Sequence, residues 1–127
     1  MGTEENKAAM RRIFSDVITG RKLDLADELY ADEHELRPDA GVGRGAEGMK
    51  QAFAALHEEF PDVRAEVESL VAEGDLVAVR VTFSGTHATS GQRSAWPEMV
   101  FTRFVDGKAV ESWEVTDTGR TWEDAPW

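Results

Sequence analysis

The chain contains no cysteine. This absence excludes disulfide bonds, a thiolate nucleophile and a cysteine-ligated metal site. Long apolar runs are missing too: they extend over a few residues only, whereas a membrane-spanning helix needs about 20. The opening residues, MGTEENKAAM, are polar and lack the pattern of a secretory signal segment. We therefore expect a cytoplasmic protein that does not associate with membranes.

Basic residues are also scarce. Lys and Arg number 14 against 25 Asp and Glu, which gives a net charge of −11. Such a charge repels a phosphate backbone and an anionic membrane surface, and the basic residues form no run along the chain. The composition therefore argues against nucleic acids and membranes as partners.

Motifs for cofactors are absent as well. The sequence has no dinucleotide-binding GxGxxG, no phosphate-binding P-loop, no GxSxG nucleophile elbow and no flavin motif. Its three histidines, His34, His57 and His87, show neither HxxxH nor HxH spacing, so no metal site is predicted. Of these, His57 lies beside Glu58 and Glu59 and is expected to be solvated. We expect chemistry that needs no cofactor or metal.

What the chain does have is the composition of a globular protein. Hydrophobic residues make up 41% and charged residues 31%, both ordinary values. A chain of 127 residues is expected to form a single domain, residues 1–127, with one core and one pocket.

The first half of the sequence has helical periodicity. Apolar residues recur at steps of three and four over residues 4–19, which predicts an amphipathic helix with Gly20 as its left-handed C-cap. A shorter helix is predicted over residues 23–30, and a third over 46–59, ended by Pro61. The polar, glycine-containing stretch 31–45 is expected to be a loop or a short strand.

After Pro61 the period changes to 2, which is typical of strands. The predicted strands are separated by turns, of which Asp106-Gly107 is a hairpin signal, and cover residues 63–69, 76–87, 96–105 and 109–117. Helices followed by an antiparallel meander indicate an α+β domain. We expect a strongly curved antiparallel sheet, wrapped by three N-terminal helices around a cone-shaped cavity.

Residues 5–31, 43–87 and 101–113, together with Asp117, carry an ordered motif, FPD…AEGD.VA.R…SGTH…DGK.VE.W…D. In order and spacing it resembles the SnoaL-like polyketide cyclases of the nuclear transport factor 2-like (ketosteroid isomerase-like) superfamily. The resemblance implies a cone-shaped α+β barrel and a homodimer packed through the outer sheet face. Because this superfamily hosts cyclases, isomerases, epoxide hydrolases, hydroxylases and binding modules, the resemblance leaves the reaction open.

The sequence departs from the family pattern at three places. The connection between His87 and Trp96 is short, which alters the rim of the pocket. Ser112 stands where family members often have His. The chain ends in TWEDAPW, which makes Trp122 and Trp127 candidates for a lid or a dimer contact.

Asp117 is the first candidate for catalysis. It ends an apolar strand and shares a face with Trp113 and Val115 by alternation. If that face lines the cavity, burial raises the pKa of the carboxyl and suits it to move a proton. The resemblance also places Asp117 where SnoaL-like cyclases keep their catalytic acid/base. The alternative is an Asp that caps the end of the strand.

His87 ends the long strand predicted over residues 76–87. An imidazole there could shuttle a proton or polarise a carbonyl group near neutral pH. The alternative is a strand-end histidine bonded to the backbone.

Glu98 interrupts an otherwise apolar strand face that it shares with Trp96, Val100, Thr102 and Phe104. A carboxylate in that position is either a functional group or the partner of a buried arginine, for which Arg80 is the candidate. Glu98, Arg80 and Asp117 could together orient a water for epoxide opening, as in epoxide hydrolases of this fold. The alternative is a structural ion pair at the sheet edge.

Large apolar side chains supply the candidate ligand contacts. Most of them must form the core of so small a chain, but four tryptophans suit a flat polycyclic ligand. The predicted contacts are Phe53, Trp96, Met99, Phe101, Phe104 and Trp113.

These observations lead to one hypothesis and two rivals. The hypothesis is a cofactor-independent cyclase or isomerase acting by acid/base catalysis on a hydrophobic, polyketide-like carbonyl compound, with Asp117 moving the proton and His87 or a water polarising the oxygen. The rivals are an epoxide hydrolase that uses Glu98, Arg80 and Asp117, and a non-catalytic small-molecule-binding module.

Overall fold

The structure is a computed structural model that describes residues 2–37 and 41–117. Helical segments come first and most strands follow, as predicted. The elements are α1 (Thr3–Arg12), the π-helical η1 (Ile13–Thr19), the 3-10 helix η2 (Leu23–Leu25), α2 (Ala26–Leu29), β1 (Tyr30–Arg37), α3 (Gly45–Glu59), β2 (Arg64–Glu73), β3 (Leu76–Thr86), β4 (Arg93–Val105) and β5 (Lys108–Thr116). The predicted lid or dimer residues Trp122 and Trp127 lie outside the described residues.

The strands form one curved, unclosed sheet in the order β1-β5-β4-β3-β2. Strands β2 to β5 make the predicted antiparallel meander. The expectation of a wholly antiparallel sheet is wrong at one edge, because β1 pairs parallel to β5. No hairpin joins these two strands, so their connection does not impose an antiparallel arrangement.

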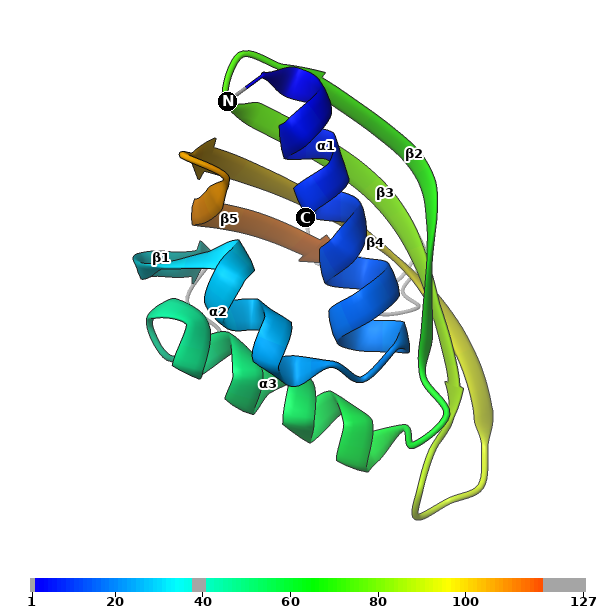
Figure 1. The fold of residues 1–127 in the computed structure, drawn as a ribbon. Helices are drawn as coiled ribbons and strands as arrows, with labels where there is room; N and C mark the ends of the chain where they lie inside the picture. The colour runs from blue at the N-terminus through cyan, green and yellow to red at the C-terminus, as the bar shows by residue number, and fades with distance from the viewer. Residues whose placement is uncertain (1, 38–40, 118–127) are drawn as a thin grey trace, which may run out of the picture.

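The helices lie on the concave side of the sheet, as Figure 1 shows. The continuous helix formed by α1 and η1 buries Met10, Val17 and Ile18 in the same cluster as Val77 and Val81 of β3. Each such side chain contributes about 1.5–3 kcal/mol through burial. The apolar face predicted for residues 4–19 is therefore the core-facing one.

The predicted left-handed C-cap at Gly20 is wrong. Gly20 has φ −75°, and the positive φ of 60° belongs to Arg21. The glycine serves a close approach instead, since a Cβ at Gly20 would lie 2.6 Å from the backbone oxygen of Asp16.

A β-bulge at Val110 sets which residues of β5 face the helices. Phe104 pairs with Ala109, but Arg103 pairs with Glu111, so Val110 has no partner in β4. One extra residue reverses the alternation that follows it. After the bulge, the even-numbered residues of β5 face the helices and the odd-numbered residues face outward.

Candidate active site

A cavity of about 230 Å³ lies between the concave face of the sheet and helices α1 and α3. Its wall is mostly apolar and includes Met10, Ile13, Phe14, Met49, Phe53, Leu56, Phe83, Trp96 and Val100. An engineered apolar cavity of about 150 Å³ binds benzene. The cavity therefore has room for a ligand of one or two rings.

Stacked aromatic rings form one side of the cavity. The rings of Trp96 and Phe83 are nearly parallel, at 8°, with centroids 5.6 Å apart. The ring of Phe60 also packs against Trp96, tilted by 45° with centroids 5.0 Å apart. Trp96 and Phe53, both predicted ligand contacts, lie in this wall. Fixed aromatic faces of this kind orient a flat ligand.

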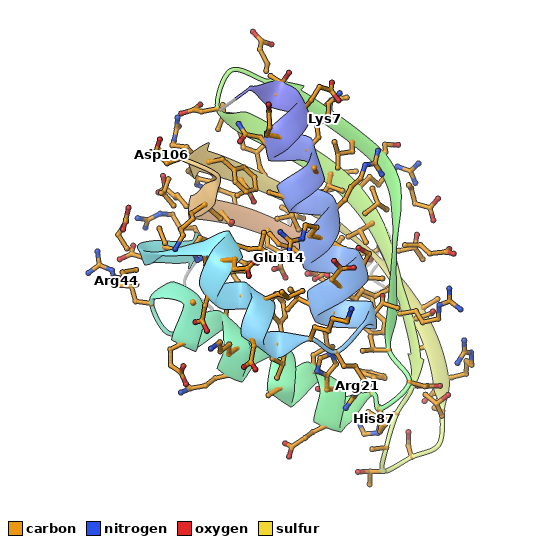
Figure 2. The ribbon with its side chains drawn as sticks, in the orientation of Figure 1. Lys7, Arg21, Arg44, His87, Asp106 and Glu114 are labelled. Carbon is orange, nitrogen blue, oxygen red and sulfur yellow. The ribbon has the colours of Figure 1, made fainter. Side chains whose placement is uncertain are left out.

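Two carboxyl groups face each other in the cavity. Glu98 of β4 lies opposite Thr116 of β5, and Glu114 is the next residue of β5 on the same face. The Thr116 Oγ1 lies 2.6 Å from Glu98 Oε1 and 3.1 Å from Glu114 Oε1, with both oxygens as acceptors. Figure 2 shows Glu114 in the middle of the molecule, within the arc of the sheet. The pair comes from two neighbouring strands and is joined by one hydroxyl.

The surroundings of the pair keep a proton on it at neutral pH. Burial, a hydrogen bond with Glu114 and the negative charge of Glu114 raise the pKa of Glu98 from 4.5 to about 8, against a smaller lowering by Thr116. Two adjacent carboxylates in an apolar site cannot both ionise cheaply. The pair can therefore act as an acid or, after losing its proton, as a base.

Tyr30 adds a phenol to the cavity wall. Burial, and then the charge of Glu114, raise the pKa of its hydroxyl above the ordinary value. The group is therefore a neutral phenol over the physiological range.

Farther along the same strands, two buried hydroxyls line the cavity. Thr102 and Ser112 face each other with 2.9 Å between their oxygens. His34 of β1 lies behind them, with its Nε2 2.9 Å from Ser112 Oγ. Burial lowers the pKa of His34 to about 4, despite the opposing charges of Glu111 and Glu35. This imidazole is neutral at physiological pH.

Asp117 does not lie among the cavity residues. Its side chain is exposed, and its backbone N–H donates to the Pro97 carbonyl oxygen at 3.1 Å. The face on which it was predicted, with Trp113 and Val115, is the outer one, and Val115 is 71% exposed. The bulge at Val110 causes this difference, because it turns the odd-numbered residues of β5 away from the helices.

His87 lies at the far end of β3, near the end of α3, as Figure 2 shows. Its Nδ1 accepts from the backbone N–H groups of Thr89 and Ser90 at 3.3 and 3.2 Å. Its Nε2 is 3.7 Å from Glu59, and its ring packs against Phe60. It does not line the cavity, and these contacts match the backbone-bonded alternative.

The predicted ion pair between Arg80 and Glu98 does not form. Arg80 pairs with Met99 rather than with Glu98 and faces outward, where its guanidinium donates to Ser69 Oγ at 3.1 Å. Glu98 faces inward, so the two side chains lie on opposite sides of the sheet. The constellation predicted for epoxide opening is therefore split between the two faces.

The remaining predicted ligand contacts lie elsewhere. Met99, Phe101 and Trp113 line an apolar groove of about 400 Å³ on the outer face of the sheet. Phe104 is a core residue, 2% exposed, and does not reach the cavity. These placements follow from alternation along β4 and from the bulge in β5.

His57 is buried, contrary to the expectation that it is solvated. It is 5% exposed, and its Nε2 donates to the Ile18 carbonyl oxygen at 2.8 Å. This contact ties α3 to η1 and makes His57 a structural residue.

Sequence reasoning missed Glu114, Tyr30, His34 and the hydroxyl pair as parts of the site. Glu114 could have been found from the Asp106-Gly107 hairpin only if the bulge in β5 were known. His34 gave no signal, because it stands alone in a polar stretch and becomes buried by pairing between β1 and β5.

Within residues 2–37 and 41–117, no three His, Asp or Glu side chains are grouped so that they could hold a metal ion. Over the same residues, no helix is both long and apolar enough to span a membrane.

Fold and site together define the class: an α+β protein whose curved sheet and covering helices enclose an apolar cavity with titratable groups. The SnoaL-like polyketide cyclase family matches residues 8–122. The chain therefore belongs to that family, as the resemblance in its sequence predicted. No curated protein matches the chain in sequence.

Solved structures show the same fold. TsrD from Streptomyces laurentii superposes with a TM-score of 0.83 at 23% identity, over 92% of this chain and 91% of TsrD. AclR from Streptomyces galilaeus, a proposed hydroxylase, superposes with a TM-score of 0.76 at 28% identity, over 91% of this chain and 77% of AclR. A proposed polyketide cyclase from Bacillus cereus superposes with a TM-score of 0.79 at 27% identity, over 89% of this chain and 74% of the cyclase.

Proposed function

We propose that this protein is a cofactor-independent cyclase or isomerase that moves a proton on a hydrophobic, polyketide-like carbonyl compound. One observation carries the proposal: the Glu98–Glu114 carboxyl pair lies in an apolar cavity and keeps a proton at neutral pH. Membership of the SnoaL-like polyketide cyclase family supports the same class of reaction.

In the proposed reaction Glu98 acts first as base, in the molecules where the pair has lost its proton, and then as acid. Its carboxylate takes a proton from the carbon next to a carbonyl group, and the C–H electrons form the enolate. The enolate carbon attacks a second carbonyl carbon of the same molecule, which forms the C–C bond and leaves an alkoxide. The alkoxide then takes the proton back from Glu98. Glu114 and Thr116 tune the carboxyl through the contacts described above.

Exchange of hydrogen for deuterium at carbon tests this role without the natural substrate. The bicyclic ketone 2-tetralone has acidic hydrogens beside its carbonyl group, and NMR in D2O follows their exchange. We expect the wild type to accelerate the exchange and Glu98→Gln to lose about a hundredfold or more of that acceleration. Glu66→Gln, an exposed carboxyl on β2, is the matched control and should keep the full rate.

Other outcomes of this experiment decide against the proposal. An unchanged rate in Glu98→Gln would remove Glu98 from the mechanism. Binding of the ketone to the wild type without any accelerated exchange would favour the non-catalytic binding module.

We also propose that the outer sheet face packs against a second copy of the chain. Val71, Met99, Phe101 and Val115 are 64%, 60%, 41% and 71% exposed and line one groove in which Arg80 is the charged residue. A patch of this kind lets two copies that each carry a net charge of −11 approach without opposing carboxylates. Sedimentation equilibrium should give the mass of two chains, and the mass of one chain would overturn the proposal.

A further inference from the structure

The buried hydroxyl pair leaves one hydrogen-bond donor unused. Among the described residues, Thr102 and Ser112 bond through their side chains only to each other and, from Ser112, to His34. Both hydroxyls line the cavity, and the two residues are 1% and 4% exposed. A buried polar group usually finds a partner, so the number of hydrogens at this cluster decides what it offers a ligand.

The protonated nitrogen of His34 follows from burial. The residue is 0% exposed, and its Nδ1 has no hydrogen-bond partner among the described residues. A buried N–H without an acceptor is rarer than a buried acceptor without a donor. We infer from this that the neutral ring carries its hydrogen on Nε2, 2.9 Å from Ser112 Oγ, and donates it to that oxygen.

This direction fixes the remaining hydrogens. The two hydroxyls carry two hydrogens, and one of them forms the bond between Ser112 and Thr102. The other is left over, and it belongs to a hydroxyl that lines the cavity. The cluster therefore presents one donor to a ligand, whichever hydroxyl supplies it.

The position of this donor relative to the carboxyl pair is set by the strands. Ser112 and Glu114 are two residues apart on β5, about 7 Å, and Thr102 and Glu98 are four apart on β4, about 13 Å, at the ordinary rise of a strand. The carboxyl end is partly exposed and the hydroxyl end is buried. The cavity thus has a polar group at each end and apolar walls between them.

We propose that the Thr102–Ser112 pair, held by His34, binds a second oxygen of the substrate, remote from the carbonyl group that reacts at Glu98. The substrate class is a two-ring-sized skeleton with an oxygen at each end. Thr102 and Ser112 contact the ligand, and His34 is a positioning residue. This assignment rests on the proposed function in two ways: it takes the cavity as the place where substrate binds, and Glu98 as the end where the carbonyl group lies.

Two isomeric ketones test the spacing. In 6-hydroxy-2-tetralone the second oxygen lies across both rings from the carbonyl group, and in 8-hydroxy-2-tetralone it lies close to the carbonyl group. We expect the wild type to bind the 6-hydroxy isomer about tenfold more tightly than 2-tetralone, as one hydrogen bond allows, and the 8-hydroxy isomer no more tightly. Equal binding of the two isomers, or no binding of either, would overturn the proposal.

Variants then assign the donor. Thr102→Val combined with Ser112→Ala should remove the tenfold preference while 2-tetralone still binds. Thr102→Ser keeps both hydroxyls and should keep the preference. A preference that survives in the double variant would overturn the assignment, and if that variant does not fold, the isomer comparison on the wild type decides alone.

The role of His34 has its own readout. His34→Gln retains a side-chain N–H and should retain most of the preference for the 6-hydroxy isomer, whereas His34→Leu should reduce it. Equal preference in the two variants would remove His34 from the assignment. Glu98→Gln should lose proton exchange but keep the preference, so failure of the proposed function and failure of this inference give different results.

Discussion

The two faces of strands β4 and β5 both depart from the pattern of most surface sheets. The inner face carries Glu98 and Glu114 with the buried hydroxyls, while the outer face carries exposed apolar side chains such as Met99 and Val115. A sheet with one solvated side normally has apolar residues inside and polar residues outside. The polar groups on the inner face support the ligand site proposed there, and the exposed apolar groups on the outer face support the proposed association of two copies.

The bulge at Val110 creates this difference on β5. If Val110 paired with β4 in a regular ladder instead, Glu111, Trp113 and Val115 would face the helices, and Glu114 would face outward. One unpaired residue therefore decides whether the carboxyl pair exists.

Deleting Val110 tests this role of the bulge. Because the residues on either side of Val110 already pair in order with β4, removing the extra residue leaves a regular ladder in which Ser112 and Glu114 still face the helices. We expect the deletion variant to unfold cooperatively in urea, within about 1–2 kcal/mol of Val110→Ala, and to keep the deuterium exchange of 2-tetralone. Loss of that exchange in a folded deletion variant would contradict this account of the register.

The bulge also explains why the sequence placed Asp117 in the site. Residues 76–87, 96–105 and 109–117 were predicted as strands from their period and from Asp106-Gly107, and the structure confirms these strands. A regular alternation groups Trp113 with Asp117, but it does not say which face is inside. Val110 is neither glycine nor proline, so nothing local marks the change of register.

Other parts of the site differ in how far sequence could predict them. Glu98 was predictable because a carboxylate interrupts an apolar face, and that pattern is local. His34 was not, since its burial depends on β1 pairing with β5 across a long stretch of chain. Local periodicity thus predicts the helices and strands, while contacts between distant segments determine which residues lie at the buried end of the cavity.

The raised pKa of Glu98 predicts that stability depends on pH through this inner-face carboxyl and not through exposed carboxyls. Its pKa is about 8 in the folded protein and ordinarily 4.5. Between these values the unfolded chain has lost the proton that the folded chain keeps, so stability falls as pH rises and levels off above about 8. Glu98→Gln removes this fall.

Urea titrations at pH 5 and pH 9 measure this effect. From pH 5 to pH 9, we expect the free energy of unfolding of the wild type to fall by about 1–3 kcal/mol more than that of Glu98→Gln. The contribution of His34, whose pKa is lowered to about 4, is common to both proteins and cancels in the difference. Glu66→Gln should follow the wild type, and an equal pH dependence in Glu98→Gln would argue against a buried protonated carboxyl.

A charge on the outer face should weaken association without weakening the fold. Val115 is 71% exposed and lines the outer groove, whereas Val105 is 49% exposed and lies outside it. We expect Val115→Asp to shift the protein toward single chains in sedimentation, and Val105→Asp to leave its mass unchanged. Both should change the free energy of unfolding of the single chain by no more than about 0.5 kcal/mol. Equal effects of the two variants on mass would argue against the groove as the interface.

Asp117→Asn should have the smallest effect, and it tests the face assignment directly. The family resemblance places the catalytic acid/base at Asp117, whereas we propose Glu98, which lies on the inner face of the sheet. Because Asp117 is exposed at the end of β5, neutralising it should leave the deuterium exchange of 2-tetralone within about twofold of the wild type, far less than the factors that acid/base groups supply. A loss as large as that expected for Glu98→Gln would mean that Asp117 reaches the ligand in the working protein, and the role of the inner face would then have to be shared between the two carboxyls.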